Sequence, residues 1–271
     1  MQNPKSDSAR TSYRLLTDAD PAPAIVSNAG ARSRFLLIGD HAGREIPRKL
    51  ARLGLTDGEL DRHIAWDIGV EGLGAKMAAA LGACFIRQRY SRLVIDCNRA
   101  PGCEDSIPLV SDGVAIPGNL RLTEQERLAR RTEIYQPYQD RIAAELDARA
   151  SAGGGTILVA LHSFTPSLQG VARPWSFGIL HQGDSPFSAR MLAVMSLALG
   201  AVVGDNQPYA MDQSDHSVAL HMTGRSLDYL ELEVRQDLIA DEAGQLAICK
   251  MLTAFFAAAS EMEPHRRSPK I

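Results

Sequence analysis

The stretch FLLIGDHAGREIP, residues 35–47, runs from five residues of apolar strand directly into charged side chains and His41. A short apolar run that ends in glycine predicts a strand buried on both faces, as in parallel sheets covered by helices. The polar groups then stand at the carboxyl end of the strand, where open α/β sheets bind their ligands. A solvated turn of ordinary polar residues is the alternative explanation.

Apolar strand-like runs recur along the chain and alternate with helical patterns. Strands are predicted over residues 34–39, 84–87, 92–96, 156–161, 176–180 and 229–234. Helices are predicted over residues 68–81, 123–149, 186–199 and 241–259, the second of which begins with the capping box Thr123-Glu124-Gln125-Glu126. This alternation predicts one α/β domain with a largely parallel or mixed sheet between helices. Residues 1–30 are expected to form a polar N-terminal arm, residues 31–262 the domain, and residues 263–271 a tail.

The composition excludes several classes of protein. The chain has 271 residues, of which 45% are hydrophobic, and a formal net charge of −3 with scattered lysines and arginines, so no nucleic-acid partner is expected. Neither a secretory signal nor an apolar run of about 18 residues is evident, which favours a soluble, cytoplasmic protein with no membrane partner. The four cysteines form no CxxC pair and are expected to be reduced.

Two histidines stand at matching positions. His41 follows the predicted strand 34–39, and His162 follows the strand 156–161 in TILVALHSFTP. Neutral imidazole is the commonest protein metal ligand, and a catalytic zinc takes about three protein ligands and keeps one open position. A hydrogen-bonded structural role is the alternative for either histidine alone.

A third metal ligand would be a carboxylate, and the residues leave two candidates open. Asp67, in HIAWDIG, begins a predicted helix, where a negative charge is also favoured by the helix dipole. Glu45 lies four residues beyond His41, where a solvated loop residue is the simpler reading.

Two further clusters carry charge at strand ends. In SRLVIDCNRAPG, Asn98 and Arg99 follow the predicted strand 92–96, and an arginine fork there can bind a carboxylate. A buried pair between Asp96 and Arg99 is the alternative.

The segment YLELEVRQDLI places Glu231, Glu233 and Arg235 on one strand face, which cannot be a dry core face because buried charges need partners. We interpret that face as lining the site, with a glutamate that activates water; an exposed edge strand is the alternative.

Eight segments together resemble the N-formylglutamate amidohydrolase family. In chain order over residues 35–240 they are DHAGREIP, RHIAWDIG, YSRLVIDCNRAP, IPGN, LHSFTP, RPW, GDNQPY and ELEVRQDLI. The resemblance implies the fold of zinc carboxypeptidases and aspartoacylase-like deacylases, a three-layer α/β/α sandwich around a mixed, mostly parallel sheet. It implies that His41 and His162 hold zinc, that Asn98 and Arg99 bind a substrate carboxylate, and that Glu233 is the catalytic base.

One departure from the relatives concerns the metal carboxylate. Carboxypeptidase-type sites take it from HxxE, whereas the third residue after His41 is Arg44, so Asp67 is the preferred third ligand and Glu45 the reserve. The expected function is metal-dependent hydrolysis of an N-formyl or small N-acyl amino acid, foremost N-formyl-L-glutamate. A non-catalytic amino-acid-binding or sensing protein on the same scaffold is the alternative. The residues expected to bind substrate are Asn98, Arg99, Arg173, Asn206, Tyr209 and His221, with Arg99 also assigned a catalytic role.

Overall fold

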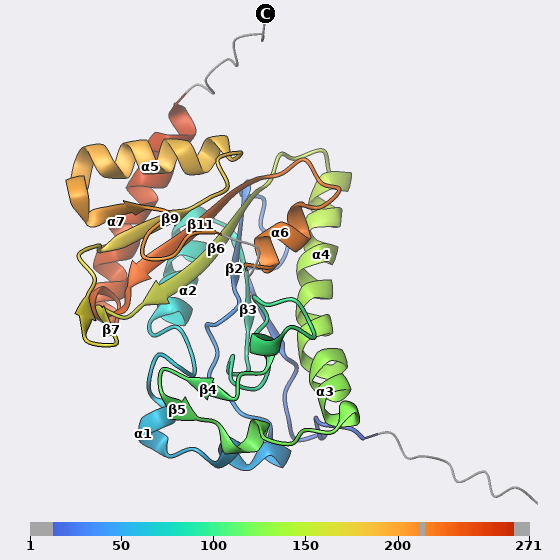
Figure 1. Cartoon of the computed structure of the whole chain (residues 1–271). Helices are drawn as coiled ribbons and strands as arrows, with labels where there is room; N and C mark the ends of the chain where they lie inside the picture. Colours follow the sequence, from blue (N-terminus) through green and yellow to red (C-terminus); the bar gives the residue numbers. More distant parts are fainter. Residues whose placement is uncertain (1–12, 212–214, 263–271) are drawn as a thin grey trace, which may run out of the picture.

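A seven-stranded sheet forms the centre of the protein. The computed structural model describes residues 13–211 and 215–262 (Figure 1). The strands lie in the order β1-β3-β2-β6-β11-β9-β10. Their bounds are Ala24–Ser27 (β1), Phe35–Gly39 (β2), Cys84–Gln88 (β3), Ile157–Phe164 (β6), Phe177–Leu180 (β9), Val203–Asp205 (β10) and Asp228–Arg235 (β11). The four neighbours β3, β2, β6 and β11 are parallel. Strand β1 runs antiparallel to β3, and β9 runs antiparallel to β11 but parallel to β10. The predicted mixed, mostly parallel sheet is confirmed.

Helices cover both faces of this sheet, which makes the expected three layers (Figure 1). On one face lie α2 (Val70–Leu81), α5 (Pro186–Leu199) and α7 (Glu242–Glu261). On the other lie α3 (Glu124–Arg130), a π-helical turn (Arg131–Tyr135), α4 (Gln136–Ser151) and α6 (Ser217–Met222). The short elements are α1 (Asp57–Leu60), β4 (Val110–Ser111), β5 (Val114–Ala115), β7 (Ser167–Leu168), β8 (Val171–Ala172) and five 3₁₀ helices, Arg48–Gly54, Glu104–Ser106, Pro117–Asn119, Gly200–Val202 and Gln236–Leu238.

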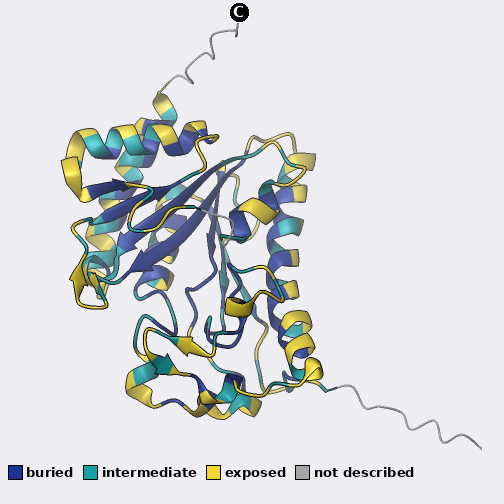
Figure 2. Cartoon of the chain, in the orientation of Figure 1, coloured by how far each residue is buried: buried dark blue, intermediate teal, exposed yellow. Residues whose placement is uncertain are grey.

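Strand β2 shows why the sheet is buried on both faces (Figure 2). Leu36 and Ile38 pack into the core beneath α4, whereas Phe35 and Leu37 pack into a second core with α2, α5 and α7. Successive side chains of a strand point to opposite faces, so a strand between two helical layers must be apolar throughout. The polar residues that follow β2 therefore emerge from a rigid, dry support.

Two sequence expectations need correction. Residues 92–96 form no strand: they make a buried turn, in which the Val94 amide donates to the Ser91 carbonyl. The extent of the polar arm is smaller than expected, because Ala24–Ser27 pairs with β3 and Leu15 is fully buried. The helix predicted over 123–149 is confirmed as an uninterrupted helical stretch over residues 124–151 that includes the π-helical turn, and its capping box at Thr123 is confirmed. The expected tail, 263–271, lies outside the described residues.

Helix α7 is long and apolar enough, by length and composition, to cross a membrane. This differs from the expectation that no apolar run of that length is present. It packs against α2 and α5, and its residues Leu252 and Phe256 are buried in the core. All four cysteines are unpaired.

Candidate metal centre and substrate cavity

Three potential metal ligands converge at the carboxyl edge of the sheet. His41 follows β2, His162 lies near the end of the neighbouring strand β6, and Asp67 lies just before α2; all three are buried. Their ligand atoms all lie within 4.8 Å of one another. Asp67 Oδ2 lies 3.0 Å from His162 Nδ1 and 3.6 Å from His41 Nδ1. A tetrahedral ion with ligands at about 2.0–2.1 Å separates its ligand atoms by about 3.3 Å, so the two distances from Asp67 Oδ2 are close to those between the ligands of a zinc ion.

The hydrogen bonds of His41 support that interpretation. Its Nε2 lies 2.7 Å from Asp96 Oδ1, while its Nδ1 is buried and has no hydrogen-bond partner. A carboxylate at one ring nitrogen keeps the proton there and leaves the lone pair of the other nitrogen for a metal. A buried imidazole nitrogen without a partner is costly unless a cation satisfies it, so these residues fit a divalent metal.

Arg92 completes this cluster, and the sequence analysis missed it. Its guanidinium lies 3.4 Å from Asp67 Oδ1 and 2.9 Å from Asp96 Oδ2, and so bridges the two carboxylates. Burial opposes ionisation of Asp67, but His41 and the hydrogen bond from His162 hold its pKa well below the usual range. The sequence analysis predicted a strand over residues 92–96, in which residues four apart are about 13 Å apart. The observed turn instead brings Arg92 and Asp96 into contact, and for this reason the role of Arg92 was not recognised.

Two buried glutamates of β11 face the cluster. Glu233 is the register partner of His162 on the parallel strand β6, and Glu231 lies two residues earlier on the same face. Each has an Oε2 atom that is buried without a hydrogen-bond partner. Burial raises the pKa of Glu233 to about 7 and that of Glu231 to about 8. Both carboxyls interact with His162, and Glu233 is the one in direct register with it.

These groups line one cavity of about 280 Å³. That volume is at the lower end for small-molecule sites and suits a ligand the size of an amino-acid derivative. The lining residues are His41, Asp67, Arg92, Asn98, Arg99, His162, Ser163, Leu180, Tyr209, Ala210, Asp215, Glu231 and Glu233.

Asn98 and Arg99 line the cavity as predicted, but both already have partners. The Asn98 side-chain oxygen accepts the backbone amides of His216 and Ser217, each at 2.9 Å. Arg99 donates to Asp105 at 3.0 Å and to the Asn98 carbonyl at 3.0 Å. The alternative pairing of Asp96 with Arg99 is replaced by the pair of Asp96 with Arg92.

Tyr209 and Arg173 form a second pair at the cavity. Tyr209 lines it, and the Arg173 guanidinium lies 4.8 Å from the centre of the Tyr209 ring. Arg173 also donates to the Thr165 carbonyl at 3.4 Å. Among the residues that the structure describes, no carboxylate forms an ion pair with Arg173, so its charge is available to a ligand.

Three residues considered for the site lie elsewhere. The Asn206 side chain accepts the His181 amide at 2.9 Å and so fixes a loop. His221 is buried on α6, with Nε2 2.7 Å from Gln139 Oε1, and burial lowers its pKa to about 4. Glu45, the reserve metal ligand, pairs with Arg89 at 2.8 Å. None of these three side chains lines the cavity, which corrects their assignments.

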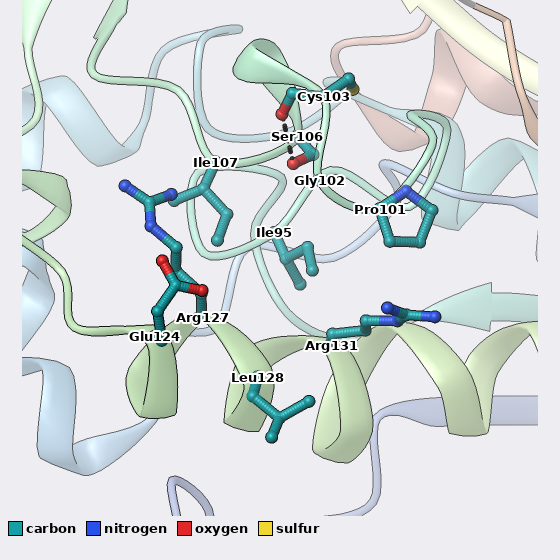
Figure 3. A pocket seen from close by; sticks show the side chains of 10 residues that line it. All are labelled: Ile95, Pro101, Gly102, Cys103, Ser106, Ile107, Glu124, Arg127, Leu128 and Arg131. Carbon is teal, nitrogen blue, oxygen red and sulfur yellow. Dashed lines mark hydrogen bonds between the residues drawn. The ribbon is translucent and has the colours of Figure 1, made fainter.

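A second cavity, of about 380 Å³, lies between α3 and the loop at residues 101–107 (Figure 3). Its wall combines apolar side chains with exposed arginines and holds none of the three potential metal ligands. Its lining residues are Ile95, Pro101, Gly102, Cys103, Ser106, Ile107, Glu124, Arg127, Leu128 and Arg131. Of these two cavities, the first is the one that contains the three potential metal ligands.

Comparison with known proteins agrees with this geometry. The sequence profile described as N-formylglutamate amidohydrolase matches residues 33–240, which include every residue of the metal cluster. The chain belongs to this family. As an N-formylglutamate amidohydrolase family member, it is an amide-hydrolysing enzyme that acts on a small molecule.

Two solved structures share the fold of this family member. A gene product of Agrobacterium tumefaciens is 37% identical, covers 91% of this chain and 98% of its own, and has a TM-score of 0.87. An N-formylglutamate amidohydrolase from Ralstonia eutropha is 17% identical over 89% of this chain and 98% of its own, with a TM-score of 0.66. No curated protein matches the chain in sequence.

Proposed function

We propose that this protein hydrolyses the amide bond of an N-formyl or other short N-acyl amino acid with the help of a divalent metal, foremost zinc. His41, Asp67 and His162 would hold the ion. The observation that carries the proposal is the buried His-Asp-His cluster, with an unpartnered His41 Nδ1, beside two buried glutamates in one small cavity. Zinc at such a site acts as a Lewis acid, which polarises an amide carbonyl and makes water a stronger acid.

Glu233 has the position and the acidity of a general base. Its unpartnered Oε2 atom lies in the cavity beside His162, and its pKa is raised to about 7 by burial. A base is most effective when its pKa is near the operating pH. Glu233 would accept a proton from the attacking water and return it to the nitrogen of the leaving amine.

Arg173 is the group we assign to a substrate carboxylate. It is extended over Tyr209 at the cavity and lacks a carboxylate partner among the described residues. A guanidinium fork makes two parallel hydrogen bonds to a carboxylate. N-formyl-L-glutamate, the compound in the family description, is the reference substrate for testing this assignment.

The test is a panel of N-formyl and N-acetyl amino acids, assayed for release of the free amine by chelator-treated protein with and without added zinc. We expect hydrolysis only with metal. Glu233→Gln should keep metal affinity and lose about 10²–10⁴-fold in kcat. Glu231→Gln, a matched change on the same strand face, should lose less. Metal-independent hydrolysis would contradict the metal role, and a larger loss in Glu231→Gln would exchange the roles of the two glutamates.

A further inference from the structure

The Asn98–Arg99 pair, which the family resemblance assigns to a substrate carboxylate, already faces a carboxylate of this chain. Asn98 Nδ2 donates to Asp215 Oδ1 at 3.3 Å, and Arg99 Nη1 lies 3.6 Å from the same oxygen. Asp215 lines the same cavity, and its side chain is only 13% exposed. The protein thus places its own acid where a ligand acid was expected.

The position of Asp215 is fixed by the residues that follow it. The amides of His216 and Ser217 both bind the Asn98 side-chain oxygen at 2.9 Å. The Ser217 hydroxyl donates to Asp40 Oδ1 at 2.8 Å, just beyond strand β2. These contacts attach the start of α6 to the rigid end of the sheet. Asp215 is therefore held against Asn98 and Arg99 by the fold.

The charges around the cavity are otherwise assigned. Arg92 is held between Asp67 and Asp96, and Arg99 is balanced by Asp215 on the cavity side and by Asp105 on the other. That leaves Arg173, over Tyr209, as the arginine of the described site without a carboxylate partner. Beside the described cavity, Arg173 therefore offers an arginine subsite for one substrate carboxylate.

A substrate with two carboxylates would meet like charge. If Arg173 binds the first, a second carboxylate that enters the Asn98–Arg99 subsite must lie beside Asp215 or displace it from Arg99. Like charges brought together in a partly dry site are strongly unfavourable, because the effective dielectric constant is well below that of water.

We propose that Asp215 is a specificity-determining residue, which fills the Asn98–Arg99 subsite so that the enzyme selects N-acyl amino acids with a single carboxylate over dicarboxylic ones. This rests on the proposed amide hydrolysis at the same cavity. The preferred class is then the N-formyl or short N-acyl derivatives of neutral amino acids, bound through their one carboxylate at Arg173.

The decisive comparison uses N-formyl-L-glutamate and N-formyl-L-glutamine, which have nearly the same shape and differ by one charge. The measured quantity is the ratio of kcat/KM for the glutamate to that for the glutamine derivative. We expect a ratio below one for the wild type. Asp215→Asn keeps the acceptor for Asn98 and removes the charge, so the ratio should rise at least about tenfold, mainly through KM, the size expected when a like-charge contact is removed.

Asp105→Asn is the matched control. Asp105 also pairs with Arg99, but it lies outside the metal cavity and its side chain is 60% exposed. Exposed ion pairs contribute little, so this variant should change the ratio less than about threefold. Arg173→Gln should lower kcat/KM for both derivatives, because both would bind Arg173 through their shared carboxylate.

An unchanged or lowered ratio in Asp215→Asn would overturn the proposal, as would a wild type that prefers the glutamate derivative by tenfold or more. Either result leaves amide hydrolysis intact. If no amide is hydrolysed, the proposed function fails by itself. In that case the affinities of the two derivatives are compared by titration calorimetry, as the ratio of the association constant of the glutamate derivative to that of the glutamine derivative. An unchanged or lowered ratio in Asp215→Asn, or a wild type that prefers the glutamate derivative by tenfold or more, would again overturn the role of Asp215.

Discussion

Replacing Asp96 by Asn tests the metal centre without changing a ligand. Asp96 Oδ1 lies 2.7 Å from His41 Nε2, and Oδ2 lies 2.9 Å from Arg92 Nη2. Asparagine keeps an acceptor for the imidazole N–H, so the ring stays in the same tautomer. It removes the negative charge that makes His41 a better electron donor. The change also leaves Arg92 free to pair more closely with Asp67, where it competes with a cation.

Both consequences of Asp96→Asn act in the same direction. Loss of a carboxylate behind a metal-bound histidine typically lowers metal affinity about 10- to 100-fold. This corresponds to about 1.4–2.7 kcal/mol of binding free energy. We therefore expect the dissociation constant for zinc to rise by at least about tenfold, while the folded structure persists.

The affinity is measured by competition with a chromophoric zinc chelator, with far-UV circular dichroism as the check on folding. Asp105→Asn, which removes an exposed carboxylate from Arg99, should keep the wild-type affinity. A folded Asp96→Asn protein that binds zinc within twofold of the wild type would refute the reasoning. The negative charge of Asp96 would then contribute nothing to metal binding by His41.

Three further results are expected. His41→Ala should lose at least nine-tenths of its bound metal, whereas Glu45→Ala, a change at a surface ion pair, should retain it; full metal content in the first variant would contradict the ligand assignment. A methyl group at Gly178 would lie 2.1 Å from a backbone carbonyl oxygen and 3.2 Å from Glu233 Cβ, so Gly178→Ala should lower both Tm and kcat, and wild-type values of both would disprove this. Because burial lowers the pKa of His221 from 6.5 to about 4, the unfolded chain binds a proton over that range and the folded chain does not. Stability should therefore be complete above pH 6.5 and fall by up to about 3 kcal/mol toward pH 4, in urea titrations that show a smaller fall for His221→Gln.

The sequence predicted the parts of the site that stand on strands. The apolar runs before His41 and His162 and around Glu233 correspond to β2, β6 and β11, which are neighbours in the sheet. Parallel neighbours end at the same edge, so residues at their carboxyl ends must meet. Asp67 was preferred for another reason: Arg44 stands where the HxxE pattern has its acid, which left Asp67 ahead of Glu45.

The parts that depend on loops could not be predicted in this way. The apolar run 92–96 indicated burial, but hydrophobicity alone does not separate a buried turn from a strand, and so Arg92 was overlooked. Asn206 lies in a segment that resembles the family, yet its side chain binds a loop amide. His221 lies between two such segments and binds Gln139. A segment resemblance does not show which side chain faces the cavity.

The residues proposed for the chemical step and those proposed for substrate selection lie in different parts of this enzyme, the first on paired strands and the second in loops. Glu233 and His162 are paired across a backbone hydrogen-bond ladder, where neighbouring strands lie about 4.8 Å apart. Arg173, Tyr209 and Asp215, in contrast, lie in connections outside the strands. Substitutions can accumulate in those connections without altering the distance between Glu233, the proposed base, and His162, a proposed metal ligand. New substrate preferences can therefore evolve on this scaffold while its chemistry is inherited unchanged.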